Sequence, residues 1–212
     1  MFTEVVIRSA EQVTSYSEEI EEHQITLRVS LANAANAVTN KRSLLSVSAC
    51  GICGKTAFEP KTRSDDELRS MTLRDDRGAD DEQSSMTLRD DIAKMMVQLR
   101  EMQSLFEETG GCHAAGVFNK NQDLLFASED IGRHNAVDKV VGSLVIHQQL
   151  REAKYLMVSG RVSYEIVAKC FAAGIPHLAA VSSPSSLAVD YAKELGISLF
   201  AFCRENRITQ YA

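Results

Sequence analysis

Residues 155–202 read YLMVSGRVSYEIVAKCFAAGIPHLAAVSSPSSLAVDYAKELGISLFAF. Short apolar runs alternate here with two amphipathic stretches, each of which is followed by a glycine, as at many helix C-termini. The predicted strands are Tyr155–Val158, Leu178–Val181 and Ile197–Phe202, and the predicted helices are Ser163–Ala173 and Ser185–Leu195. A strand–helix–strand–helix–strand order with short loops indicates parallel strands joined by right-handed crossovers. The fold class is therefore predicted to be α/β.

The sequence before this stretch predicts a long helix, a hairpin and a second helix. The first helix carries one apolar face and ends at Gly110-Gly111; that face consists of Ile92, Met95, Met96, Leu99, Met102 and Phe106. Runs His113–Phe118 and Leu124–Ala127 flank a turn-rich segment and predict a β-hairpin. The second helix is predicted over Asn135–Leu150, with Val137, Val140, Val141, Leu144 and Val145 facing inward.

The N-terminal part is harder to interpret. Residues 25–31 alternate apolar and polar side chains and predict a half-buried strand. Charge dominates from Glu59 to about Asp91, and we interpret this stretch as an exposed linker. It contains the sequence SMTLRDD at 70–76 and again at 85–91; nothing in the sequence explains the duplication.

Composition limits the class of protein. The chain has 212 residues, 44% of them hydrophobic and 25% charged, which is ordinary for a globular protein. Its net charge of −6 disfavours bulk binding to nucleic acid or anionic membranes. No apolar run approaches the ~20 residues that span a bilayer, and the N-terminus does not resemble a signal peptide. We expect a cytoplasmic protein with no nucleic-acid or membrane partner.

Polar turns follow the predicted parallel strands, where ligands of such sheets bind. The turns 159–163 and 181–185 lead into helix N-termini, and 203–207 follows the last strand. Serine hydroxyls, a glycine and arginine side chains suit phosphate oxygens. Taken singly, these residues are typical of helix caps and solvated surface. Together they predict a phosphate or nucleotide site that includes Arg161, Ser182 and Arg207.

The segment Glu129-Asp130-Ile131-Gly132-Arg133-His134-Asn135 is a further site candidate, with Arg133 and His134 at the edge of the same cleft. The bland alternative is a polar loop in which Asn135 caps the following helix. The chain has neither a Gly-x-Gly-x-x-Gly motif nor a Walker loop, which disfavours an ordinary dinucleotide enzyme or ATPase.

Five cysteines are present, at positions 50, 53, 112, 170 and 203. Cys170 lies in an apolar stripe and is expected to be a buried core residue. Cys50 and Cys53 form a glycine-flanked Cys-x-x-Cys pair that suits sulfur transfer through a persulfide. Three alternatives stay open: a thioredoxin-like redox pair, a zinc site completed by Cys112-His113, and two inert thiols.

The chain closely resembles the formate dehydrogenase accessory sulfurtransferase (FdhD) family from about Ser48 to Tyr211. Five motifs occur in the family's order: ACGICG at 49–54, TGGCHAA at 109–115, EDIGRHNAVDK at 129–139, SGRVSYE at 159–165 and FCRENR at 202–207. The resemblance implies a cytidine-deaminase-like α/β domain, which we place at 91–212. It also implies a smaller N-terminal α+β domain at 1–49, with the Cys-x-x-Cys loop and linker at 50–90. Because family members carry a longer segment before Phe2-Thr3-Glu4, we expect this small domain to be incomplete.

The resemblance also implies function. Cys50 would carry the persulfide with Cys53 as its partner, and a cysteine desulfurase would supply the sulfur. The acceptor would be the molybdenum cofactor, bis(molybdopterin guanine dinucleotide), on its way to formate dehydrogenase. It would bind near Phe202, Cys203, Arg204, Glu205, Asn206 and Arg207. We further expect a homodimer and no permanently bound metal.

Two other functions remain possible from the sequence alone. A binding chaperone would hold the cofactor without moving sulfur, and a zinc-bound structural module would use the cysteines as ligands. Deaminase chemistry is not implied, because His113 is followed by Ala114 and Ala115 rather than by the glutamate of His-x-Glu, and no Pro-Cys-x-x-Cys occurs.

Overall fold

The protein is seen in a computed structural model that describes residues 13–20, 25–31, 81–204 and 207–212. Strands β1 (Val13–Ile20) and β2 (Ile25–Leu31) form an antiparallel pair. The prediction of a strand over 25–31 is thus confirmed, whereas its partner β1 was missed. Most of the predicted linker and the whole Cys50–Cys53 pair lie outside the described residues.

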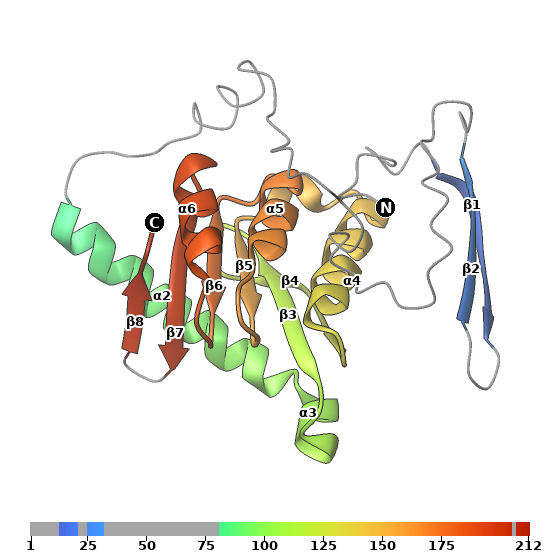
Figure 1. Cartoon of the computed structure of the whole chain (residues 1–212), viewed down its shortest axis with the longest axis horizontal. Coiled ribbons are helices and arrows are strands. Elements are labelled where there is room, and N and C mark those ends of the chain that lie inside the picture. The colour runs from blue at the N-terminus through green and yellow to red at the C-terminus, as the bar shows by residue number, and fades with distance from the viewer. Residues whose placement is uncertain (1–12, 21–24, 32–80, 205–206) are drawn as a thin grey trace.

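A six-stranded mixed sheet forms the centre of the rest of the chain (Figure 1). Its strands are β3 (His113–Phe118), β4 (Leu124–Asp130), β5 (Tyr155–Val158), β6 (His177–Ala180), β7 (Ser198–Arg204) and β8 (Arg207–Gln210). They lie in the order β4-β3-β5-β6-β7-β8. Strands β5, β6 and β7 are parallel neighbours, and every other pairing is antiparallel. The predicted α/β class and the parallel central strands are confirmed; the likeness to cytidine deaminases stays a prediction.

Helices cover both faces of this sheet. They are α2 (Asp81–Glu101), α3 (Ser104–Thr109), α4 (Arg133–Ile146), α5 (Tyr164–Ala172) and α6 (Ser186–Glu194), with a 3₁₀ turn at Leu150–Glu152. Helices α4, α5 and α6 lie on one face, and α2 crosses the other (Figure 1). Gly174 and Gly196, which follow α5 and α6, have φ values of 73° and 66°. Glycine adopts this left-handed conformation without steric cost, so both predicted helix ends are confirmed.

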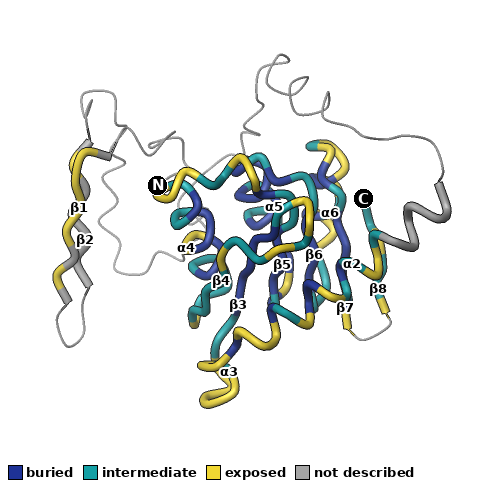
Figure 2. Tube along the Cα trace, turned by 180° about the vertical axis from the view of Figure 1, so that it is seen from behind, coloured by how far each residue is buried: buried dark blue, intermediate teal, exposed yellow. Residues whose placement is uncertain are grey.

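Two hydrophobic clusters lie on the two faces of the sheet. Alternation along the strands sends Leu156 and Val158 to the face under α4–α6, and Met157 to the face under α2. Ile92, Met95, Met96 and Leu99 form the buried stripe of α2. Figure 2 shows that the buried residues gather in the sheet and in the inner faces of the helices.

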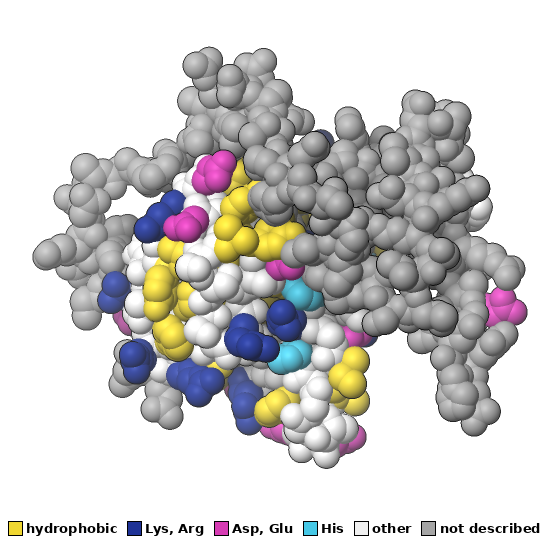
Figure 3. All heavy atoms as spheres, viewed as in Figure 1, with side chains coloured by type: hydrophobic (Ala, Val, Ile, Leu, Met, Phe, Trp, Pro, Cys, Tyr) yellow, Lys and Arg dark blue, Asp and Glu magenta, His cyan; other side chains and the backbone are white. Residues whose placement is uncertain are grey.

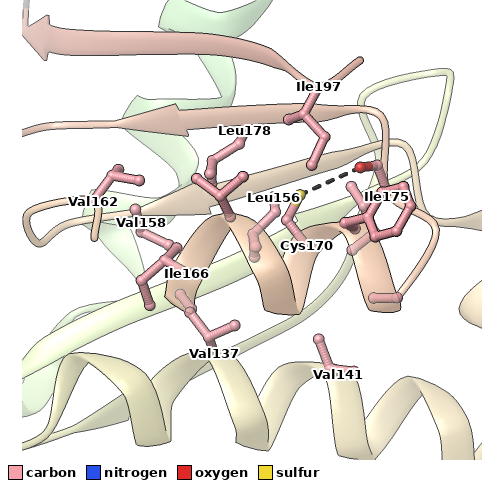
Figure 4. Close-up of a cluster of buried hydrophobic side chains, with 14 of the residues drawn as sticks. Val137, Val141, Leu156, Val158, Val162, Ile166, Cys170, Ile175, Leu178 and Ile197 are labelled. Atoms are coloured by element: carbon pink, nitrogen blue, oxygen red, sulfur yellow. Dashed lines mark hydrogen bonds between the residues drawn. The ribbon is translucent and has the colours of Figure 1, made fainter. Parts of the chain in front are cut away.

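The α5 helix illustrates this packing. Ile166 and Cys170 point from α5 towards Leu156 and Leu178 of the sheet, with Val137 and Val141 of α4 nearby (Figure 4). The Cys170 thiol donates to the carbonyl of Ile175 at 3.3 Å. The prediction that Cys170 is a buried core residue is confirmed.

The linker prediction was wrong at its C-terminal end. Helix α2 begins at Asp81, so the second copy of the repeated sequence, at 85–91, is helical. The buried apolar stripe begins at Ile92, about three turns after the start of the helix. Its packing against the sheet stabilises a first half whose polar residues show no helical period.

The helix predicted through Phe106 is also interrupted. Its backbone tightens at Met102 and Gln103, whose N–H groups bond to the carbonyls of Leu99 and Arg100. Met102 is 51% exposed rather than part of the stripe. The separate helix α3 follows, with its first N–H groups bonded to the Glu129 carboxylate at 2.8 and 2.9 Å. This contact between distant residues has no local sequence signal.

The alternative interpretation of 129–135 as a polar loop capped by Asn135 is wrong. Glu129 and Asp130 belong to β4, and Gly132 occupies the N-cap position of α4. Asn135 does not cap the helix; its amide donates to Asp130 Oδ1 at 3.1 Å. The helix ends at Ile146, four residues before the predicted end.

Among the described helices, none combines the length and apolar character needed to cross a membrane.

Candidate functional site

Strand directions bring the polar turns to one side of the sheet. Because β5, β6 and β7 are parallel, the segments that leave them emerge at the same edge. Strand β3 runs opposite to β5, so its first residue, His113, lies there too, beside the last residue of β4, Asp130. We call this side of the sheet the carboxyl edge. Ligands of open α/β sheets bind at such an edge.

Hydrogen bonds join neighbouring segments along the carboxyl edge. Ser159 Oγ accepts from Ala114 N at 2.8 Å, and Ser159 N donates to the Ala114 carbonyl at 3.0 Å. Val162 N donates to the carbonyl of Ser183 at 3.1 Å, so the turns after β5 and β6 extend the parallel ladder. Phe202 N donates to the carbonyl of Ser182 at 3.3 Å. The edge is thus one connected surface.

Cationic side chains outnumber free carboxylates at this edge. Within the described residues, no ion pair involves Arg133, Arg161, Arg204 or Arg207. Glu129 is engaged by the N-terminus of α3, and Asp130 by Lys139 at 2.7 Å. Burial alone raises the pKa of Asp130, but hydrogen bonds from Lys139, Gly132 and Asn135 outweigh it and lower that pKa. Figure 3 shows Lys, Arg and His side chains gathered on the lower part of the face covered by α4–α6.

The side chains of His113 and Arg133 meet at Gly160. This glycine is buried, and a Cβ added to it would lie 3.2 Å from His113 Nδ1 and 3.3 Å from Arg133 Cβ. Burial lowers the pKa of His113, and the guanidinium groups of Arg133 and Arg161 lower it further. An imidazole in this position is neutral at pH 7 and lacks an anion that would favour its charged form.

His134 points elsewhere. Its Nε2 lies 3.1 Å from Ser163 Oγ, in the contact region between α4 and α5. Burial lowers the pKa of His134, Arg133 lowers it further, and Glu165 partly opposes them. One turn further along, Lys169 of α5 pairs with Asp138 of α4. The His134 side chain therefore links two helices.

Phe202 has a strained backbone at the end of β7. Its φ is 55°, a value that bulky residues rarely adopt and that costs on the order of 1–3 kcal/mol. The strand register shifts between Ala201 and Arg204, as at a β-bulge. Arg207 lies over the Phe202 ring, with 5.8 Å between guanidinium carbon and ring centroid. An aromatic ring beside an arginine is a surface on which a nucleobase can stack.

The structure places most of the predicted site residues at the carboxyl edge. Those described are Arg133, His134, Arg161, Ser182, Phe202, Cys203, Arg204 and Arg207. The Cys203 side chain is only 4% exposed, so it packs inward beneath this surface. Cys50, Cys53, Glu205 and Asn206 lie outside the described residues.

His113 belongs to this edge, which the sequence does not predict, since it marks His113 only as a possible zinc ligand beside Cys112. Within the described residues, no three His, Cys, Asp or Glu side chains gather as metal ligands. The available signal was its position at the start of an antiparallel strand beside β5. That signal could be used only once the strand order was known.

Comparison with known proteins gives consistent relationships. A sequence model of the FdhD/NarQ family matches residues 1–212. The chain is 42% identical over 188 residues to the sulfur carrier protein FdhD of Mycolicibacterium paratuberculosis, covering 88% of this chain and 64% of that protein. It is 44% identical over 172 residues to the protein of the same name from Nocardia farcinica, covering 81% of this chain and 58% of the relative. The chain thus spans about three fifths of these relatives' length.

A solved structure is also similar. It is described as that of a candidate formate dehydrogenase accessory protein from Desulfotalea psychrophila. The two share 35% sequence identity with a TM-score of 0.53, over 57% of this chain and 52% of that one. Together with the match along its whole length, these relationships show that the chain belongs to the FdhD/NarQ family.

Proposed function

We propose that this chain carries sulfur on Cys50 and delivers it to a guanine-nucleotide-bearing molybdenum cofactor used by formate dehydrogenase. The observation that carries the proposal is the carboxyl edge, where arginines without carboxylate partners among the described residues surround a connected row of turns. Membership of a family whose relatives are named sulfur carrier proteins supports it.

The sulfur step needs a reactive thiolate. Cys50 would attack the outer sulfur of a cysteine desulfurase persulfide; a new S–S bond forms, the donor's S–S bond breaks, and the donor cysteine leaves as a thiolate. Cys53, three residues along the sequence, would exchange with Cys50. We also expect formate dehydrogenase and a second copy of the chain as partners.

Two of the other thiols are poor candidates for this chemistry. Burial raises the pKa of Cys170, and burial raises that of Cys203 to about 11, although a hydrogen bond with Ala180 lowers it slightly. Since the thiolate is the nucleophile, both are protonated and unreactive at neutral pH. Cys112 is half-buried and is the remaining competitor.

The acceptor matches the chemistry of the carboxyl edge. Its bridging diphosphates offer oxygens to Arg133 and Arg161, which can make charge-assisted hydrogen bonds. Its guanines offer flat rings to Phe202 and Arg207. The residues present therefore fit the group that the proposal assigns to them.

Mass spectrometry after incubation with a cysteine desulfurase and cysteine tests the proposal. The wild-type chain should gain about 32 Da per bound sulfur, and Cys50→Ala should gain none. Cys112→Ala is the matched control and should load normally. Loading that persists in Cys50→Ala and disappears in Cys112→Ala would refute Cys50 as the carrier. A wild-type chain that binds nucleotide but never gains sulfur would instead be a cofactor chaperone.

A further inference from the structure

His113, at the start of β3, is half-buried and is flanked by groups from two other segments. Arg133 comes from the first turn of α4, Arg161 from the turn after β5, and Gly160 leaves no side chain between them. A Cβ at residue 160 would press on both His113 and Arg133. The absence of a side chain at residue 160 thus allows the His113 imidazole and the aliphatic part of the Arg133 side chain to approach the same point of the backbone.

Among the described residues, no carboxylate forms an ion pair with Arg133 or Arg161. Asp130 lies opposite His113 in the β3–β4 register, but its carboxylate is taken up by Gly132, Asn135 and Lys139. Glu129, the next acidic residue along β4, accepts two N–H groups of α3. Such a cluster of positive groups is stabilised when an anion enters it.

We propose that His113, Arg133 and Arg161 form the binding site for a diphosphate diester, and that His113 takes up a proton when this ligand binds. The inference rests on the proposed function in one respect, because a cofactor with a nucleotide attached through a diphosphate bridge supplies such a diester. The phosphoryl oxygens accept hydrogen bonds from both guanidinium groups and from the protonated imidazole.

Proton uptake follows from the change in surroundings. In the free protein, burial and the two arginines hold the pKa of His113 below the usual value of about 6.5. A bound anion opposes those arginines and raises the pKa of His113. At pH values between the pKa of His113 in the free protein and its pKa in the complex, the binding of each ligand molecule is therefore accompanied by the uptake of a fraction of a proton. Affinity rises as the pH falls through this window and is constant below it.

The surroundings of His113 differ from those of His134, the histidine next to Arg133. His134 faces Ser163, and the carboxylates of Glu165 and Asp138 lie among its neighbours. An anion at Gly160 therefore meets His113 directly, whereas His134 is turned towards α5.

Isothermal titration calorimetry with diguanosine diphosphate tests the proposal. The diphosphate bridge of this diester has no ionisation of its own between about pH 5 and 8, so uptake measured across buffers of different ionisation enthalpy comes from the protein. Wild type should take up a fraction of a proton near pH 6, and His113→Gln none. His113→Gln should also bind about tenfold more weakly at acidic pH, with a smaller deficit at about pH 8. His147→Gln, at the far end of α4, is the control and should match wild type.

Three results would each overturn the inference. They are binding of the ligand to the wild-type chain without proton uptake, proton uptake by His113→Gln as large as that of wild type, and no binding of the ligand at all. Persulfide formation on Cys50 is measured separately, so failure here does not imply failure of the sulfur-carrier proposal. If His113→Gln does not fold, Arg161→Gln provides a second test, since Arg161 is exposed. Nuclear magnetic resonance should show a higher His113 pKa in Arg161→Gln; an unchanged pKa would contradict the proposed cluster.

Discussion

The turns before α5 and α6 have the same backbone arrangement, but their serine side chains make different contacts. Each follows a parallel strand and has a serine in extended conformation at the N-cap, Ser163 and Ser185. Ser185 Oγ accepts from Ala188 N at 3.2 Å and so caps its own helix. Ser163 makes no such bond, and its hydroxyl lies against His134. One turn stabilises its helix locally, while the other is tied to α4 and carries Arg161 into the candidate site.

The largest effect separating the two turns should appear in nucleotide binding. Arg161→Ala removes a charge-assisted contact worth about 1.5–3 kcal/mol, so guanosine diphosphate should bind roughly tenfold or more weakly. Arg151→Ala is the matched control, because it removes an exposed arginine just before β5, at the opposite edge. Calorimetry measures both. Equal affinity in Arg161→Ala and wild type would remove the turn after β5 from the binding site.

For stability, the turn before α6 should matter more than the turn before α5. Ser185→Ala removes a helix cap and should lower the free energy of unfolding by about 1 kcal/mol, with little effect on sulfur loading. Urea denaturation gives the value, and Ser186→Ala, one residue inside the same helix, is the control. No loss in Ser185→Ala would mean that the cap contributes nothing in solution.

A fall in pH should lower the stability of the folded protein through His113 and His134. His113 and His134 have lowered pKa values in the folded protein, so below about pH 6.5 the unfolded chain binds protons more readily. The stability they contribute is complete above that pH and is lost as the pH falls through their folded pKa values. Asp130 adds a further loss at more acidic pH, below its usual pKa. Thermal unfolding of His113→Gln should show a shallower decline between about pH 7 and 5 than wild type. An identical decline would contradict the assigned environment of His113.

The smallest expected effect is the coupling between His134 and Ser163. A double-mutant cycle with His134→Ala and Ser163→Ala should give about 0.5–1 kcal/mol of interaction energy, the range of an ordinary hydrogen bond. The corresponding cycle with Ser185→Ala should be additive. Additivity in both cycles would remove the distinction between the two turns.

The fold was predictable where local pattern and tertiary packing agree. Alternating apolar runs and helix-ending glycines identified β5, α5, β6, α6 and β7 to within one to two residues at most ends. Prediction failed where a distant partner decides the structure. The start of α3 depends on Glu129, and the helical first half of α2 depends on the packing of its second half.

The site was predictable in the same partial way. Parallel strands required the turns with Arg161 and Ser182 to share an edge, and the pairings confirm that they do. The separate orientations of Arg133 and His134 could not be read from adjacent positions, because helix α4 starts earlier than its sequence suggests. His113 joined the edge through an antiparallel pairing that no local pattern specifies.

In the proposed function, sulfur loading and cofactor binding use different parts of one chain. The most direct test measures both properties, by mass spectrometry and by calorimetry with guanosine diphosphate, in Cys50→Ala and in Arg207→Ala. Cys50→Ala should lose the gain of about 32 Da and keep nucleotide binding, whereas Arg207→Ala should keep the gain and bind nucleotide roughly tenfold more weakly. Sulfur gain by Cys50→Ala, or wild-type nucleotide affinity in Arg207→Ala, would contradict this separation of the two sites.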